Sequence, residues 1–258
     1  MKKKLAYSDL RAFRECPQQY WKRVNRAKRV ARTVHEAVGD ITHAASADDS
    51  KERQAHTAKQ LAELPQEQRA EVAKVVEELT AAALEMSEAQ DVSDREKEKQ
   101  LRWLDPETGW ELLAKPDEIG MVEDPRGGEI LQIVDNKTAY KLRSKHLKQL
   151  YFFGLVARLA KKYPGAIRLV VRLLRSKDEA VFFSSPKKVD RELAKIRRTI
   201  RAIESRLASG NFEAVTGKQC EGCPYREGCD AYQQMLKVQS SRNTHRQHAL
   251  PVVQPERK

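Results

Sequence analysis

The sequence has few cysteines, few aromatic residues and no long hydrophobic run. Its 258 residues include 4 cysteines, and Phe, Trp and Tyr make up only 6%. No stretch approaches the roughly 18 apolar residues that a membrane-spanning helix needs, and no apolar segment of a secretory signal follows the basic start. We therefore expect a cytoplasmic protein without membrane association. In that compartment the cysteines are not explained by structural disulfides.

Acidic residues are outnumbered by basic ones. The chain has 49 Lys and Arg against 37 Asp and Glu, which gives a formal net charge of +12. This surplus favours a polyanionic partner such as nucleic acid, although a basic protein without such a partner has the same composition. A chain of this length easily buries a core, and no internal repeat is visible.

The N-terminal part of the sequence has helical patterns. Residues 7–24 are amphipathic with a break at Cys16, because the following proline disfavours helix in the residue before it. A second helical stretch covers residues 30–44. Residues 47–99 are rich in Ala, Glu, Gln and Lys, which predicts long surface helices divided near Pro65. We interpret this region as an α-helical insert within a single domain.

From Leu101 onward, strand and helix patterns alternate. The expected elements are strands at 101–104, 110–114, 167–174 and 180–183, and helices at 144–162 and from 186 to about 209. This order predicts an α/β fold in which helices flank a sheet. The second helix is basic from 187 to 206, which indicates either a solvated face or a surface that tracks DNA. We expect one domain over 1–236 and a disordered basic tail over 237–258.

Residues 115–137 hold the strongest candidate site. Two apolar runs flank a turn between Asp124 and Gly128, which predicts a β-hairpin. Because antiparallel strands place the start of the first beside the end of the second, Asp117 and Asp135 should meet at one sheet edge, with Lys137 on the same face. Two carboxylates and an ammonium there suit a hard cation and phosphodiester hydrolysis. Ordinary turn and cap roles are the alternative for the two acids.

Three of the four cysteines form a C-x2-C-x5-C run near the end of the sequence. These are Cys220, Cys223 and Cys229, and Cys16 lies 220 − 16 = 204 positions before the first of them. Thiolates spaced in this way bind zinc or an iron–sulfur cluster, and the spacing does not separate the two; ordinary buried thiols are the alternative. With Cys16 as fourth ligand, the site would clasp residues 1–24 to 210–232 and constrain the unfolded chain by about 5 kcal/mol.

Together these residues resemble the PD-(D/E)XK nucleases, specifically the RecB-like branch that carries an iron–sulfur cluster. That branch includes the CRISPR-associated RecB-like exonucleases and the nuclease domain of AddB. The resemblance covers residues 5–232 and leaves 47–99 unmatched. Its four motifs, in the family's order, are Ser8, Leu10, Phe13, Cys16, Pro17 and Tyr20; His35 and Glu36; KPDEIG with IVDNKT; and the cysteine triplet.

The resemblance implies a restriction-endonuclease-like core with a mixed central sheet. It also implies that Asp117 and Asp135 bind Mg²⁺ or Mn²⁺, with the imidazole of His35 and the backbone carbonyl of Asn136 as further ligands. Lys137 would orient or deprotonate the attacking water. An imidazole ligand shifts preference towards Mn²⁺.

The resemblance further implies substrate contacts from the helix after the hairpin. Gln149 matches a family glutamine that contacts the active site or DNA. Phe153 stands where the family has a tyrosine, and Tyr151 lies nearby on another side of the helix. The four cysteines would hold a [4Fe-4S] cluster, with zinc as the alternative. We interpret the remaining histidines as solvated; these include His43, His56 and His146.

The implied function is a metal-dependent DNA nuclease. We expect an exonuclease acting on single-stranded DNA or DNA ends, with endonuclease activity left open, in recombination and repair, phage DNA processing or CRISPR adaptation. The alternative is a DNA-binding or scaffold subunit of such a complex with little or no cleavage. The complete set of two acids and a lysine argues against it, because a degenerate nuclease has no need of all three. Protein partners and a homo-oligomeric state are left open.

Overall fold

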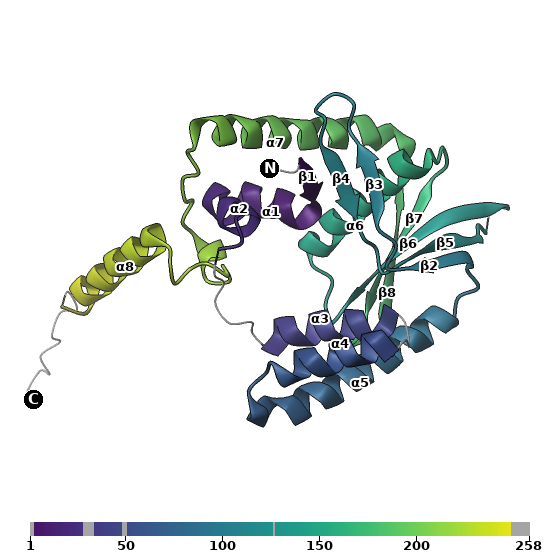
Figure 1. Ribbon diagram of the computed structural model, residues 1–258, viewed down its shortest axis with the longest axis horizontal. Helices are drawn as coiled ribbons and strands as arrows, with labels where there is room; N and C mark the ends of the chain where they lie inside the picture. The colour runs from purple at the N-terminus through teal and green to yellow at the C-terminus, as the bar shows by residue number, and fades with distance from the viewer. Residues whose placement is uncertain (1–2, 28–33, 48–50, 126, 249–258) are drawn as a thin grey trace, which may run out of the picture. The chain divides into compact units, whose positions relative to one another are not determined.

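The chain folds into two compact units in the computed structural model (Figure 1). The structure describes residues 3–27, 34–47, 51–125 and 127–248. Unit 1 comprises 1–10 and 32–204, and unit 2 comprises 11–31 and 205–258, where the sequence analysis expects one domain. Two helices contribute residues to both units, α1 (Tyr7–Glu15) and α7 (Val189–Ser209).

Unit 1 is built on a five-stranded sheet in the order β2-β5-β6-β7-β8. The strands are β2 (Ser93–Lys97), β5 (Glu118–Glu123), β6 (Glu129–Lys137), β7 (Ile167–Leu173) and β8 (Asp178–Ser184). The predicted hairpin is β5–β6, and its turn holds Gly127 and Gly128 at φ 99° and 82°, which glycine adopts at no steric cost. Because β6 and β7 pair in parallel while the other neighbours are antiparallel, the sheet is mixed and the predicted α/β fold is confirmed.

The crossover from β6 to β7 is α6 (Ser144–Lys161). It packs against three strands of the large sheet and against a second sheet of β1 (Lys4–Ala6), β4 (Glu111–Ala114) and β3 (Leu101–Leu104). Phe152 and Phe153, neighbours that point to different sides of the helix, are both buried. A helix that is apolar on several sides belongs in the interior, so α6 forms part of the core.

Three further helices lie side by side in unit 1 (Figure 1), α3 (Val34–Ala47), α4 (Lys51–Ala62) and α5 (Gln66–Glu88). Their shared apolar cluster includes Leu174 just after β7, which ties the helices to the sheet. Pro65 separates α4 from α5, as predicted. The prediction of a helical insert over 47–99 is wrong at its C-terminal end. Residues 93–97 form β2, which is an edge strand of the large sheet. Charged side chains dominate β2, so it has no hydrophobic period, and backbone pairing with β5 defines it.

Unit 2 joins the N-terminal helices to the C-terminal segment by aromatic contacts. Trp21 stacks on Phe212 with ring centroids 4.7 Å apart. The break at Cys16 lies where predicted, with extended backbone at that residue before α2 (Pro17–Val24). The short 3₁₀ helices are η1 (Pro186–Lys188), in unit 1, and η2 (Lys218–Cys220), in unit 2.

The last helix, α8 (Asp230–His248), continues into the expected disordered tail. It contains neither glycine nor proline, the two residues that most disfavour a helix interior. Residues 249–258 lie outside the described part. Within the described residues, no helix is both long and apolar enough to cross a membrane.

Candidate functional site

The end of β6 brings Asp135 and Lys137 into direct contact. The Nζ atom of Lys137 lies 2.8 Å from Oδ1 and 2.7 Å from Oδ2 of Asp135. Asp135 is only 2% exposed. Burial raises the pKa of Asp135; Lys137 opposes this, while the charge of Asp117 adds to the rise. The predicted convergence of both acids and the lysine is therefore present in the structure.

Asp117 lies immediately before β5 and is held from several directions. Its Oδ2 accepts a hydrogen bond from the backbone N–H of Asn136 at 2.5 Å, and its Oδ1 lies 2.9 Å from Nδ1 of His43. Burial alone would raise the pKa of Asp117, but the charge and hydrogen bond of His43 outweigh it, and the pKa is lowered. The same contact raises the pKa of His43. The carboxylate is thus fixed between the last residues of β6 and the helix α3.

The imidazole beside Asp117 comes from His43, so its interpretation as a solvated histidine is wrong. His35 belongs to the same helix, but its side chain lies outside the described part. His35 lies eight positions before His43, which corresponds to about 12 Å of rise along α3. Gly39, one turn before His43, is a signal that the sequence analysis missed. A Cβ there would lie 3.5 Å from Oγ1 of Thr138, so this face of α3 approaches the end of β6.

Glu98 is a further site residue that the sequence analysis missed. Within the described part of the chain, the ligand atoms of His43, Glu98 and Asp117 lie within 4.8 Å of one another. One nitrogen and two carboxylate oxygens that converge in this way can hold a divalent cation, because small side-chain rotations bring them to the ligand distances of about 2.0–2.6 Å that such ions need. Glu98 follows the polar strand β2, whose charged sequence gives no hint of a site.

The helix α6 carries the remaining predicted residues, of which Gln149 contacts the site. The Oε1 atom of Gln149 is 3.3 Å from Nζ of Lys137, so α6 supports the lysine. Tyr151 is half-buried and, two positions further on, lies about 200° around the helix from Gln149. His146 is buried rather than solvated, and burial, with Lys137 nearby, lowers its pKa to about 4.

The basic side chains of α7 are largely engaged with acids of unit 1. Arg197 binds the fully buried Asp105 at 2.7 Å, and both Arg197 and Arg201 pair with Glu107. Lys195 lies 2.7 Å from an oxygen of Glu192. For the basic helix, these pairs favour a solvated face over a surface that tracks DNA.

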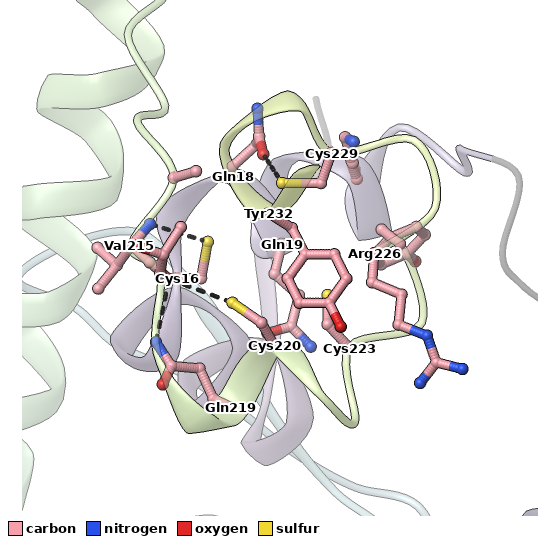
Figure 2. A pocket seen from close by; sticks show the side chains of 14 residues that line it. Cys16, Gln18, Gln19, Val215, Gln219, Cys220, Cys223, Arg226, Cys229 and Tyr232 are labelled. Carbon is pink, nitrogen blue, oxygen red and sulfur yellow. Dashed lines mark hydrogen bonds between the residues drawn. The ribbon is translucent and has the colours of Figure 1, made fainter. Parts of the chain in front are cut away.

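All four cysteines line one cavity of unit 2, with their side chains directed towards a common space (Figure 2). The Sγ atom of Cys16 accepts a hydrogen bond from the backbone N–H of Val215 at 3.4 Å. Burial raises the pKa of Cys223, and the other three cysteines add to the rise. Four sulfur donors around one cavity are a set that fits zinc or an iron–sulfur cluster.

Comparisons with known proteins give one family match and two similar solved structures. The family model of the PD-(D/E)XK nuclease superfamily matches residues 4–230. A solved structure from Eubacterium rectale, described as a candidate exonuclease, superposes with a TM-score of 0.59 at 12% identity, covering 99% of this chain and 91% of that chain. The structure of SSO0001 gives a TM-score of 0.45 at 12% identity, over 90% and 88%. No curated protein matches the sequence.

Structural likeness at 12% identity shows the fold alone. The family match is broader, because it runs from β1 to the start of α8 and includes the hairpin with both acids and the lysine. The chain belongs to the PD-(D/E)XK nuclease superfamily.

Proposed function

We propose that the protein is a metal-dependent deoxyribonuclease that hydrolyses phosphodiester bonds of single-stranded DNA or DNA ends. The contact of Lys137 with the buried Asp135, beside Asp117, is the observation that carries this proposal. Both acids and the backbone carbonyl of Asn136 would hold Mg²⁺ or Mn²⁺, and the imidazole of His43 would favour Mn²⁺. When bound, the cation acts as a Lewis acid towards the phosphate and lowers the pKa of water.

Lys137 supplies the positive charge next to the reacting phosphate. Its ammonium group is held by Asp135 at 2.8 Å and by Gln149 at 3.3 Å, so it is oriented before substrate binds. A fixed ammonium stabilises the negative charge that develops on the phosphate and orients the attacking water. Gln149 acts as a positioning residue for this lysine, whereas Tyr151, on another side of α6, is a DNA contact only by the family resemblance.

An exposed aromatic ring beside the site supports a single-stranded substrate. Tyr140 is 65% exposed and comes three residues after Lys137. The guanidinium of Arg175 lies 5.4 Å from its ring centroid and is anchored by a 3.3 Å hydrogen bond to the carbonyl of Thr138. Unpaired bases stack on such rings without sequence preference.

The proposed imidazole ligand is tested by replacing each histidine of α3 separately. His43→Ala should lower Mn²⁺-dependent degradation of end-labelled DNA by about a hundredfold or more, because the contact with Asp117 is lost. His35→Ala is the matched control and should keep most of the activity. An inactive His35→Ala protein beside an active His43→Ala protein would assign the ligand to His35 instead.

The cleavage reaction itself is tested with end-labelled DNA, single- and double-stranded, linear and circular, incubated with Mn²⁺ or Mg²⁺. We expect linear single strands to be degraded and circles to be spared. Lys137→Ala is the inactive control. Binding of DNA without turnover in either metal would overturn the nuclease proposal in favour of a DNA-binding subunit.

Cys16 and the C-terminal triplet would hold a [4Fe-4S] cluster. Tetrahedral zinc needs sulfurs about 3.8 Å apart, from a Zn–S distance of about 2.3 Å. Among the described residues, no three cysteine sulfurs lie within 4.8 Å of one another, and this wider spacing favours the larger cluster. Anaerobically purified protein should be brown, with an absorbance band at about 400 nm. Colourless protein holding one zinc would indicate a zinc clasp.

A further inference from the structure

Beyond the two acids and the lysine of the proposed site, a third carboxylate faces Asp117. Glu98 directly follows β2, and its side chain is only 15% exposed. Its backbone N–H donates a hydrogen bond to the carbonyl of Asp117 at 2.9 Å. The main chain therefore holds the two residues next to each other.

The side chains converge as well. A carboxylate oxygen of Glu98, a carboxylate oxygen of Asp117 and a ring nitrogen of His43 all lie within 4.8 Å of one another. Asp135, which lies beside Lys137, is outside this group of three. Two carboxylates this close repel each other unless positive charge lies between or beside them.

The positive charge that the structure places at Glu98 is Lys115. The two side chains form an ion pair, and the lysine side chain is 50% exposed. Because half of the Lys115 side chain is exposed, its ammonium group can turn into water once a bound cation replaces it beside Glu98. The carboxylate of Glu98 would then face His43 and Asp117.

From this geometry we infer that Glu98 is a ligand of a divalent cation, together with His43 and Asp117, and that Lys115 is the counter-ion that the cation displaces. The donor set of two oxygens and one imidazole suits Mn²⁺. The inference rests on the proposed metal-dependent function and adds Glu98, the residue directly after β2, to its cation site.

Calorimetric titration of the protein with Mn²⁺ tests the inference independently of cleavage. Glu98→Gln should weaken Mn²⁺ binding by about tenfold or more. Glu96→Gln is the matched control: it removes the same charge two residues earlier, where Glu96 pairs with Lys99 and Lys161, and should bind as the wild type does. Lys115→Ala should tighten binding, because it removes the competing cation.

A purely structural role for the ion pair of Glu98 and Lys115 predicts different results. In that case Glu98→Gln and Lys115→Ala would both lower the melting temperature without metal, and neither would change Mn²⁺ affinity. Should Glu98→Gln fail to fold, Glu98→Asp keeps the charge but withdraws the carboxylate, and weaker binding is again expected. Wild-type affinity in these Glu98 variants would overturn the inference.

Asp117→Asn separates failure of this inference from failure of the proposed function. If Asp117→Asn loses Mn²⁺ while Glu98→Gln retains it, only the role of Glu98 is wrong. If Glu98→Gln loses Mn²⁺ and the wild type still cleaves no DNA, the ligand stands and the nuclease proposal fails. If neither variant changes Mn²⁺ binding, the result contradicts both the role of Glu98 and the proposed metal site at Asp117.

Discussion

Lys137 and Asp135 form a buried ion pair whose contribution to stability depends on both partners being present. The side chains of Lys137 and Asp135 are 15% and 3% exposed. Removing one partner of such a pair leaves an uncompensated buried charge, whereas removing both does not. The pair therefore couples stability to activity at a single contact.

A double-mutant cycle measures this coupling. Lys137→Met should lower the free energy of unfolding by about 3 kcal/mol, because Asp135 loses its partner in the interior. The double variant Lys137→Met with Asp135→Asn should recover part of that loss in urea denaturation, while cleavage stays abolished in both proteins. Additive losses in the double variant would mean that the two side chains do not interact.

His146 makes stability depend on pH. Its Nδ1 accepts a hydrogen bond from the backbone N–H of Arg143 at 3.4 Å, and its pKa in the folded protein is lowered to about 4. The unfolded chain takes up this proton near pH 6.5. The contribution is therefore fully present above about pH 6.5 and is lost as the pH falls towards 4.

Urea denaturation at two pH values tests this dependence. From pH 8 to pH 5 the folded protein should lose about 2 kcal/mol through His146. The variant His146→Gln, which has no proton to gain, should show a correspondingly smaller drop. Equal drops in both proteins would assign the acid sensitivity to other groups.

At the scale of elements, the approach of β2 to β5 depends on Gly120. A Cβ atom on Gly120 would lie 2.4 Å from Cγ1 of Val92 and 2.8 Å from the carbonyl oxygen of Ser93. The β2–β5 pairing is irregular between Ser93 and Glu96. A side chain at position 120 would therefore displace the start of this edge strand, which leads directly to Glu98.

Gly120→Ala should push β2 away from β5. We expect a loss of about 1–3 kcal/mol in thermal or urea unfolding, together with weaker Mn²⁺ binding, because Glu98 moves with the strand. Adding Val92→Ala should restore part of both losses by removing one of the two clashes. The steric explanation is contradicted if this second change rescues neither property.

At the scale of the whole molecule, the cysteine cavity joins segments of unit 2 that are far apart in the sequence. Cys16 and Cys220 line the same cavity, although 220 − 16 = 204 positions separate them. A ligand group bridging such a loop removes conformational freedom from the unfolded chain, by about 5 kcal/mol at most. Unit 2 also has its aromatic contacts, so it does not depend on the bridge alone.

Cys16→Ser should abolish the brown colour and make unit 2 the weaker part of the protein. Limited proteolysis should then cut first within 205–248, while fragments of unit 1 persist. Mn²⁺ binding should be retained, because the cation site belongs wholly to unit 1. Simultaneous loss of both properties would contradict two independent sites.

The sequence by itself determined the local features. Glycines in the turn between two apolar runs are enough to pair β5 with β6, and that register brings Asp117, Asp135 and Lys137 to one edge. Pro17 and Pro65 likewise mark helix boundaries through their own backbone restrictions. Each of these signals acts over a few residues, so it can be read without the rest of the chain.

Only the tertiary structure decided which distant residues join that edge. His43 reaches Asp117 because α3 packs on α5 through the shared apolar cluster, and helical periodicity alone does not say which histidine of the helix faces a strand end. Glu98 follows a strand defined by backbone hydrogen bonds to β5, which leave no pattern in side-chain polarity. The local hairpin thus supplies half of the site, and long-range packing supplies the imidazole and the third carboxylate.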